Sequence, residues 1–189
     1  MNTGRKLRGL KRHSAEVNHI VIESLKEALI LLIKEKPYDK ITIVELCQKA
    51  GVSRMGFYGN FQTKDDIVKK IVIDINQMLV DRIGSPFRQT TDDKWYYSLF
   101  CLAKELSNVL ISLKNAGFLE EYNRLINDIV LHDNEISTDE VYQRIIWNGG
   151  IVNAICYWLS TGMKETPEEM GKYCNENLVP WSMKNNKIN

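Results

Sequence analysis

The residues that most restrict the fold are 42–61, TIVELCQKAGVSRMGFYGNF, because they carry the start, stop and restart signals of two short helices. Thr42 and Glu45 have the spacing of a capping box, in which each side chain satisfies a free backbone N–H of the other residue. Gly51 stands where a tight turn favours a residue that tolerates positive φ. Ser53 can then cap a second helix. Two short helices joined in this way form a helix-turn-helix.

The apolar residues of this segment agree with that interpretation. One face of the first helix recurs at helical spacing, with Ile43, Leu46, Cys47 and Ala50. Cys47 is small enough to let two helices cross closely, and Phe57 and Phe61 return at four-residue spacing to anchor the second helix. A second helix held in this way is free to lie in the major groove of double-stranded DNA.

The outer face of the second helix is too polar to be ordinary core. Arg54 suits a guanine edge or a phosphate, and Met55 suits a thymine methyl group. The predicted DNA-binding residues are Thr42, Ser53, Arg54, Met55, Gly56, Tyr58, Asn60 and Lys64. A flexible basic arm could add phosphate or minor-groove contacts through Arg5, Lys6, Arg8, Lys11 and Arg12. Each residue alone could equally be a solvated polar side chain, but cap, turn, anchors and basic surface agree with one another.

The net charge of +1 conceals an asymmetry along the chain. Residues 1–64 hold 12 Lys and Arg against 6 Asp and Glu, which gives +6. Residues 65–189 hold 13 against 18, which gives −5. A basic first third and an acidic remainder favour a polyanionic partner at one end of the chain.

The apolar pattern is helical along most of the chain, and no credible strand is found, so the predicted fold class is all-α. Further long helices are expected at about 15–35, 64–83, 92–115, 118–132, 138–161 and 167–178. Their start signals include Thr63 to Asp66, Ser137 to Glu140, and Thr166-Pro167 to Glu169. We expect two domains, an N-terminal arm with the helix-turn-helix at 1–63 and a helical body at 64–189.

The run ITIVELCQKAGVSRMGFYGNFQTKDDIV resembles the DNA-binding signature of the TetR family of regulators, and the match covers about residues 15–75. GGIVNAICYWLSTGMKETPEEM, at 149–170, resembles the C-terminal half of a Gram-positive branch of that family. The resemblance implies a three-helix, homeodomain-like domain followed by a ligand-binding and dimerisation bundle. It also implies a homodimer whose last two helices form an intermolecular four-helix bundle, with DNA contacts from Thr42, Arg54, Tyr58 and Lys64.

Three residues depart from the family pattern. Gly59 stands where a larger DNA-facing side chain is frequent, Asn60 where histidine or tyrosine is frequent, and Pro37 where glycine is common. Glycine at position 59 weakens the second helix by about 1 kcal/mol relative to alanine. These departures leave the fold intact and the operator sequence unpredicted.

The body is rich in aromatic residues, which fill either a core or a pocket for a small apolar or aromatic effector. The residues predicted to line such a pocket are Trp95, Tyr96, Phe100, Phe118, Tyr122, Tyr142 and Trp147. Two adjacent glycines inside a helix are costly unless another backbone comes close, so we assign that face to the dimer seam. The predicted interface comprises Gly149, Gly150, Asn153, Tyr157, Met170 and Tyr173.

Other classes of protein find little support. The four cysteines, Cys47, Cys101, Cys156 and Cys174, lie far apart and without histidine at metal-ligand spacing, so neither a metal site nor a disulfide framework is predicted. No catalytic motif or nucleotide fingerprint occurs, so we expect neither an enzyme nor a bound cofactor. No stretch is long and apolar enough to span a bilayer, so we expect a cytoplasmic protein.

The resulting hypothesis is a sequence-specific, DNA-binding transcription regulator, a homodimer on a palindromic operator and a repressor released by a small-molecule effector. Two alternatives stay open at this stage. The first is a DNA-binding protein that takes its signal from another protein, and the second is a helical interaction protein that never contacts DNA. The operator sequence, the regulated genes, the effector and the sign of control are not predicted.

Overall fold

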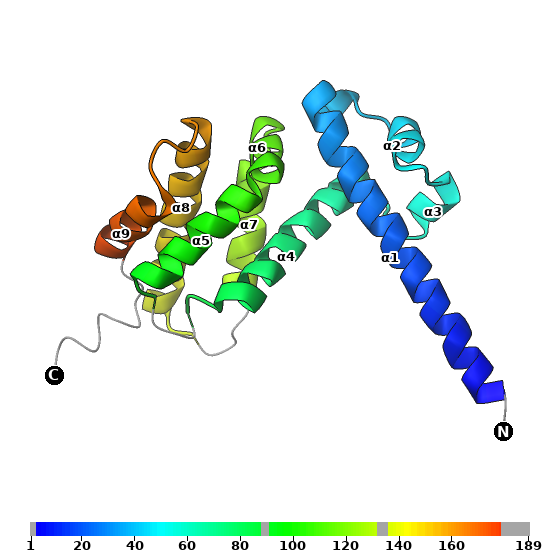
Figure 1. Cartoon of the computed structure of the whole chain (residues 1–189), viewed down its shortest axis with the longest axis horizontal. Coiled ribbons are helices and arrows are strands. Elements are labelled where there is room, and N and C mark those ends of the chain that lie inside the picture. The colour runs from blue at the N-terminus through cyan, green and yellow to red at the C-terminus, as the bar shows by residue number, and fades with distance from the viewer. Residues whose placement is uncertain (1–2, 88–90, 132–135, 179–189) are drawn as a thin grey trace. The chain divides into compact units, whose positions relative to one another are not determined.

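A computed structural model describes residues 3–87, 91–131 and 136–178, with the side chains of 3–13, 129 and 130 outside that description. Within these ranges the chain forms nine α-helices, one 3-10 turn and no strand, which confirms the all-α prediction (Figure 1). The elements are α1 (Thr3–Glu35), η1 (Tyr38–Lys40), α2 (Ile43–Ala50), α3 (Arg54–Tyr58), α4 (Lys64–Ile83), α5 (Asp93–Glu105), α6 (Ser107–Asn115), α7 (Leu119–Val130), α8 (Thr138–Ser160) and α9 (Pro167–Asn177).

The chain divides into two compact units, Met1–Ile71 and Val72–Asn189. The first unit holds α1, η1, α2, α3 and the first turns of α4, whose remaining turns belong to the second unit. Its core is formed by fully buried side chains from each of these α-helices, namely Leu25, Leu29, Leu46, Phe57, Ile67 and Val68. The predicted domain boundary, between residues 63 and 64, lies at the start of that same shared helix.

The core of the second unit is aromatic and joins α5, α8 and α9. Tyr96 and Phe100 of α5 are completely buried, and the Phe100 ring meets the edge of Trp158 with centroids 5.2 Å apart. Trp147 donates its indole N–H to Tyr96 Oη at 2.9 Å, and Tyr96 donates in turn to the carbonyl of Leu178. A buried hydroxyl that both accepts and donates is fully satisfied, so this network fixes the three helices without a desolvation penalty.

Three of the predicted capping boxes are confirmed and one is wrong in part. Both reciprocal bonds form in Thr42 with Glu45, in Thr63 with Asp66, and in Thr166 with Glu169. At α8 the Glu140 N–H donates to Ser137 Oγ at 3.3 Å, but the Glu140 carboxylate accepts from Arg144 at 2.6 Å instead of returning to the cap. Because the guanidinium is charged, it is the stronger donor for that carboxylate.

Two helices differ from their predicted bounds. The basic segment expected as a flexible arm belongs to α1, which begins at Thr3. That segment is rich in Arg, Lys and Leu, all good helix formers, and it lacks the cap signal that would have marked the start. The helix expected at 92–115 is broken at Leu106, where φ is −89° and ψ is 7°, although neither proline nor glycine marks the break.

Candidate nucleic-acid interface

The turn between α2 and α3 has the geometry that its sequence predicts. Gly51 ends α2 with φ of 66°, in the left-handed region that suits glycine. The next N–H, from Val52, donates back to the carbonyl of Cys47 at 2.9 Å. Ser53 then begins α3 by accepting a hydrogen bond from the Gly56 N–H at 3.0 Å. These bonds satisfy backbone groups at both helix ends, so the turn holds the two helices at a fixed angle.

Apolar contacts hold the inner face of α3. Phe57 is completely buried, and its ring lies 6.2 Å from that of Phe61, which follows the helix and is also buried. A Cβ placed on Gly56 would lie 3.0 Å from Val52 and 3.9 Å from Val21 of α1. Glycine at this position therefore allows close packing within the first unit.

Three predicted DNA-binding residues remain on the outer face of α3. Met55 is 86% exposed and Tyr58 is 59% exposed. Arg54 is exposed at the first turn, and its guanidinium forms no ion pair or hydrogen bond with any residue that the structure describes. A free guanidinium, a thioether and a phenol on one short helix supply donors and an apolar contact of the kind that reads a major groove.

The other predicted contacts on this segment are used within the chain. Thr42 Oγ1 accepts from the Glu45 N–H at 3.2 Å, so its hydroxyl belongs to the cap of α2. Asn60 donates its amide to the carbonyl of Gly56 at 2.9 Å and so satisfies a free carbonyl at the end of α3. Together with Ser53, these side chains stabilise the ends of α2 and α3 and so help to fix the geometry of the helix-turn-helix.

Lys64, at the first position of α4, connects three segments of the first unit. Its ammonium donates to the carbonyls of Tyr38 and Ile41 at 2.6 and 3.0 Å and lies 4.1 Å from the centre of the Tyr38 ring. Tyr38 in turn donates its hydroxyl to the Asp65 carboxylate, and burial followed by that bond raises the pKa of Tyr38. Sequence reasoning did not identify Tyr38, because its partners lie more than twenty residues away.

The cap of α2 also carries an ion pair. Glu45 accepts from Lys36 as well as from Thr42. The hydrogen bond from Lys36, followed by the two from Thr42, lowers the pKa of Glu45 to about 2. A carboxylate held ionised at the N-terminus of α2 also interacts favourably with the positive end of that helix dipole.

Comparison with known proteins agrees with this geometry. Residues 26–71 match the family described as "Bacterial regulatory proteins, tetR family". The chain carries the DNA-binding domain of the TetR family. It is thus a DNA-binding transcription regulator, and its helix-turn-helix is the family's N-terminal domain.

Two solved structures share the fold. One is a TetR transcriptional regulator from Streptococcus agalactiae 2603V, with a TM-score of 0.62 and 18% identity, over 89% of this chain and 99% of that one. The other is the fatty acid degradation regulator FadR from Bacillus halodurans, with a TM-score of 0.54 and 17% identity, over 86% and 96%. No curated protein matches the chain in sequence.

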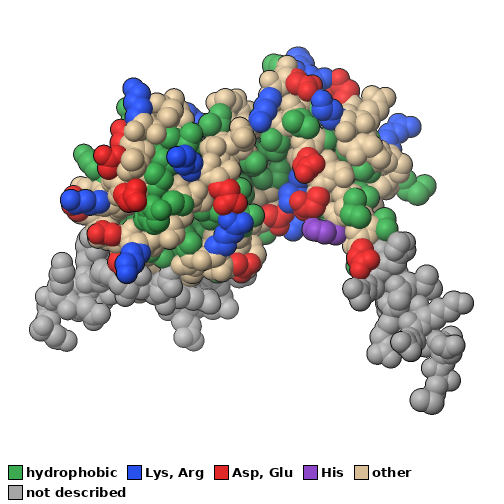
Figure 2. Space-filling model, viewed as in Figure 1, with side chains coloured by type: hydrophobic (Ala, Val, Ile, Leu, Met, Phe, Trp, Pro, Cys, Tyr) green, Lys and Arg blue, Asp and Glu red, His purple; other side chains and the backbone are tan. Residues whose placement is uncertain are grey.

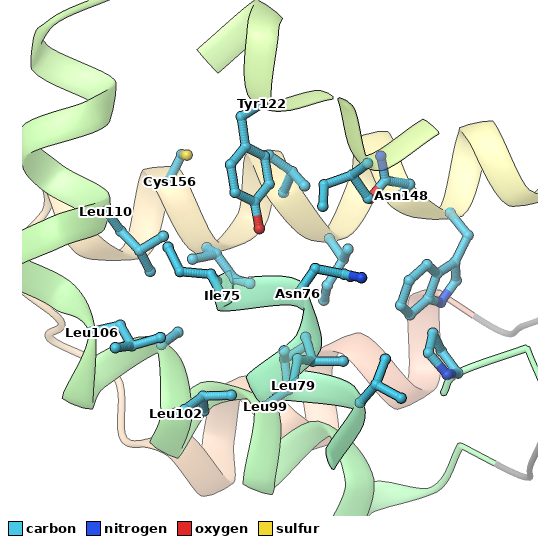
Figure 3. A pocket seen from close by; sticks show the side chains of 18 of the residues that line it. Ile75, Asn76, Leu79, Leu99, Leu102, Leu106, Leu110, Tyr122, Asn148 and Cys156 are labelled. Carbon is cyan, nitrogen blue, oxygen red and sulfur yellow. The ribbon is translucent and has the colours of Figure 1, made fainter. Parts of the chain in front are cut away.

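The second unit of the chain encloses a cavity of about 610 Å³, a volume within the range of small-molecule sites. Apolar side chains form most of its wall, among them leucines and isoleucines from α4, α5, α6 and α8 (Figure 3). Among the predicted pocket residues, Trp95, Phe118, Tyr122 and Trp147 line it. Tyr96 and Phe100 lie instead in the adjacent core, and Tyr142 is 62% exposed on α8.

Polar groups interrupt this apolar wall at a few places. The Tyr122 hydroxyl and the Asn76 side-chain amide both point into the cavity (Figure 3), and neither forms a hydrogen bond with any described residue. Burial raises the pKa of Tyr122 to about 12, so its hydroxyl remains a donor at neutral pH. Two cations, Lys114 and Arg144, also line the wall.

The outward face of α8 is apolar in a way that the cavity does not explain. Ile146 is 70% exposed and Tyr157 is 73% exposed. The residues of this stripe recur every three or four positions, namely Tyr142, Ile146, Gly149, Asn153 and Tyr157, and Tyr173 of α9 is likewise exposed. Three of the predicted interface residues, Asn153, Tyr157 and Tyr173, thus lie on exposed surface of α8 and α9, and Gly149 between them is partly buried.

The two remaining interface residues are less exposed. Met170 is partly buried and packs against the core of the second unit. Gly150 faces its own chain, because a Cβ there would lie 2.8 Å from the side chain of Leu178. Gly149 has no such neighbour within 4 Å.

The visible surface of residues 72–178 mixes acidic and basic side chains, with hydrophobic side chains reaching the surface between them (Figure 2). Among the described residues, no group of three or more His, Cys, Asp and Glu could hold a metal ion. Over the same residues, no helix has both the length and the apolar character needed to cross a bilayer.

Proposed function

We propose that the protein is a homodimeric repressor that binds a palindromic operator and is released from it by a small ligand in the cavity of the second unit. The observation that carries the proposal is the outer face of α3, where Arg54, Met55 and Tyr58 are exposed while the rest of the helix is held by caps and packing. A rigid helix with a few free side chains can reproduce one set of base contacts at every encounter.

We assign the DNA contacts according to what each side chain has left to offer. Arg54 reads a guanine edge, Met55 contacts a thymine methyl group, and Tyr58 donates to a phosphate. Lys64 uses two of its three donors within the chain, so one donor remains for a phosphate. Thr42, Ser53, Gly56 and Asn60 contribute through the shape of the backbone and the N–H groups at helix starts.

The stripe on α8 and the exposed face of α9 form the proposed dimer interface. Exposed Ile146 and Tyr157 are residues that a lone chain would not favour on its surface, and aromatic residues are typical anchors of interfaces. Gly149 has no side chain and no neighbour within 4 Å of a Cβ position, so it leaves room at the centre of the stripe for a second copy of α8 to approach closely. A two-fold pair would present two α3 helices to successive major grooves about 34 Å apart.

Control by a ligand follows from the path of α4. This helix begins in the helix-turn-helix unit at Lys64 and supplies Ile75, Asn76 and Leu79 to the cavity wall. A ligand that moves α4 would alter the spacing of the two reading helices. To convert nearly full occupancy of the operator into nearly none, it must favour the released state by about 5.5 kcal/mol. We propose repression because blocking polymerase requires occupancy alone, and cytoplasmic action because the operator is there.

Selection of genomic fragments with the purified protein, followed by sequencing, tests the function. We expect enrichment of one inverted repeat, with affinity that falls steeply as salt rises. Arg54→Ala should change the preferred base at one position in each half-site, at a cost of about 1–3 kcal/mol. Glu27→Gln, on an exposed face of α1, is the matched control and should leave the preference unchanged. Equal, weak binding to every sequence would overturn the proposal.

A further inference from the structure

The cavity is elongated along α8. Wall residues on this helix extend from Arg144 to Cys156, a separation of about 18 Å at the rise of an α-helix. Between them the wall consists of Trp147, Asn148, Ile151, Val152 and Ile155, and the facing segments add several leucines, namely Leu79, Leu99, Leu102, Leu106, Leu110 and Leu113. A largely apolar wall of this length can accommodate an extended hydrocarbon chain.

The charges on the wall have one sign. Lys114 and Arg144 are the charged residues among those that line the cavity in the described part of the chain, and no Asp or Glu lines it there. A cationic ligand would therefore enter an apolar space without a carboxylate to pair with, at a large desolvation cost. An anionic ligand would find a partner.

The two cations are not equivalent. Arg144 is 7% exposed, already pairs with Glu140 at 2.6 Å, and lies over the Phe87 ring at 5.0 Å. Lys114, in the last turn of α6, forms no ion pair or hydrogen bond with a described residue. The positive charge of Lys114 is thus the one on the cavity wall that has no ion-pair partner among the described residues.

Cys156 and Tyr122 are two further groups on the cavity wall. The charge of Lys114 acts on the Cys156 thiol and so partly offsets the effect of burial, which raises the thiol pKa. Cys156 in turn is close enough to Tyr122 to act on its hydroxyl. Figure 3 shows Cys156 and Leu110 on one side of the cavity, Asn148 on the other, and the Tyr122 hydroxyl pointing between them. Lys114 and Tyr122 thus supply an ammonium and a phenolic donor to the same cavity.

We propose that the cavity binds a long-chain, unbranched carboxylate, with its carboxylate at Lys114 and Tyr122 and its hydrocarbon tail along α8 toward Trp147. As the identity of the effector, this inference rests on the proposed function; as a binding site, it depends only on the second unit. The Arg144–Glu140 pair then closes the far end of the cavity beside the tail and does not hold the carboxylate.

Three ligands of equal chain length test the charge. Hexadecanoate, hexadecanol and hexadecyltrimethylammonium are titrated below their micelle concentrations into the full-length protein, and binding is followed by calorimetry. We expect hexadecanoate to bind at least about tenfold more tightly than either analogue, since a hydrogen bond to a charged group contributes more than one to a neutral group. Equal or tighter binding of the ammonium compound would overturn the proposal.

Two variants locate the carboxylate. Lys114→Gln should weaken hexadecanoate binding about tenfold, and Tyr122→Phe should weaken it several-fold, while hexadecanol is unaffected. Lys104→Gln is the matched control, because Lys104 is exposed on α5 and does not line the cavity. Circular dichroism establishes that each variant is folded. Unchanged affinity in Lys114→Gln would overturn the assignment of the head group.

Tryptophan fluorescence determines the direction of the tail. Trp147 and Trp95 line the cavity with their rings 5.8 Å apart, whereas Trp158 does not line it. Bromine quenches indole on contact, so an acid brominated near its methyl end should quench more strongly than one brominated beside the carboxylate. The reverse order would place the head group at Arg144 and overturn the orientation.

The same protein separates this inference from the proposed function. Hexadecanoate binding with no effect on the DNA complex would support the ligand class and overturn release by the ligand. DNA binding that remains specific while no carboxylate binds would leave the regulator intact and overturn the ligand class.

Discussion

The two units of the chain use their polar side chains in different ways. In the first unit, most polar residues near the reading helix bond within the unit, namely Thr42, Ser53, Asn60 and Lys64. In the second unit, polar groups face the cavity without a partner among the described residues, and large apolar side chains are exposed on α8. The polar groups around the reading helix are thus mostly satisfied within the chain, whereas polar groups on the cavity wall of the second unit are available to a ligand.

This difference follows from what each unit has to do. A reading helix must keep one geometry, and every cap or clamp that bonds internally removes an alternative conformation. A switching unit needs two states of similar free energy, and unsatisfied polar groups around a cavity keep the empty state from becoming too stable. The predictions below test whether the units differ in this way.

Removal of the aromatic anchor of α3 should have the largest effect on stability and should separate the unfolding of the first unit from that of the second. Phe57→Ala deletes a completely buried ring and should cost the first unit about 3–5 kcal/mol. We expect two separate transitions in chemical denaturation followed by circular dichroism, with only the first displaced and dimerisation retained. Met55→Ala, which truncates an exposed side chain, is the control. A single transition shifted as a whole would show that the units unfold together.

A charge on the α8 stripe should have the opposite result, with dimerisation weakened and the stability of the first unit unchanged. Ile146→Glu should leave the first unit folded but places a carboxylate within the proposed interface. At a cost of about 2 kcal/mol or more, dimerisation should weaken at least about 30-fold, as measured by sedimentation velocity. Met55→Glu introduces the same charge on exposed surface of the other unit and should not affect assembly. A dimer that persists in Ile146→Glu would place the interface elsewhere.

The first unit was largely predictable from sequence, because its signals are local. Thr42 and Glu45 are three residues apart, and the conformation of Gly51 depends on the turn that immediately surrounds it. The Lys64 clamp, meaning the bonds from its ammonium to the carbonyls of Tyr38 and Ile41, was not predictable. These two residues lie 26 and 23 positions away in the sequence. A lysine near a DNA-binding helix indicates a phosphate contact when only sequence is considered.

The second unit was less predictable because α8 is apolar on two faces. One face lines the cavity through Ile151 and Ile155, and the other forms the stripe with Ile146 and Tyr157. Helical periodicity identifies a single apolar face, so it could not assign Tyr142 to the stripe in preference to the cavity. Likewise, the break at Leu106 carries no local signal, although Leu106 itself lines the cavity.

Loss of the Lys64 clamp should have an intermediate effect, confined to the first unit. Lys64→Gln removes two charge-assisted hydrogen bonds and the contact with the Tyr38 ring, which are partly exposed to solvent. We expect the first transition to lose about 1–2 kcal/mol and the second to be unchanged. Lys34→Gln removes the same charge from an exposed residue of α1 and should change stability by less than about 0.5 kcal/mol. Equal losses in the two variants would mean that charge, and not the clamp, matters.

The smallest effect should be a dependence on acid that belongs to the first unit alone. The pKa of Glu45 is lowered from 4.5 to about 2 by its bonds with Lys36 and Thr42. A carboxylate whose pKa is lower in the folded state contributes stability above its usual pKa and loses it as pH falls through the folded value. The urea midpoint of the first unit should therefore fall between about pH 4.5 and pH 2. Glu45→Gln should flatten that decline, whereas Glu27→Gln, at an exposed site in α1, should leave it unchanged. If Glu45→Gln declines as steeply as the parent protein, another carboxylate is responsible, and the cap of α2 does not set the acid stability of the reading unit.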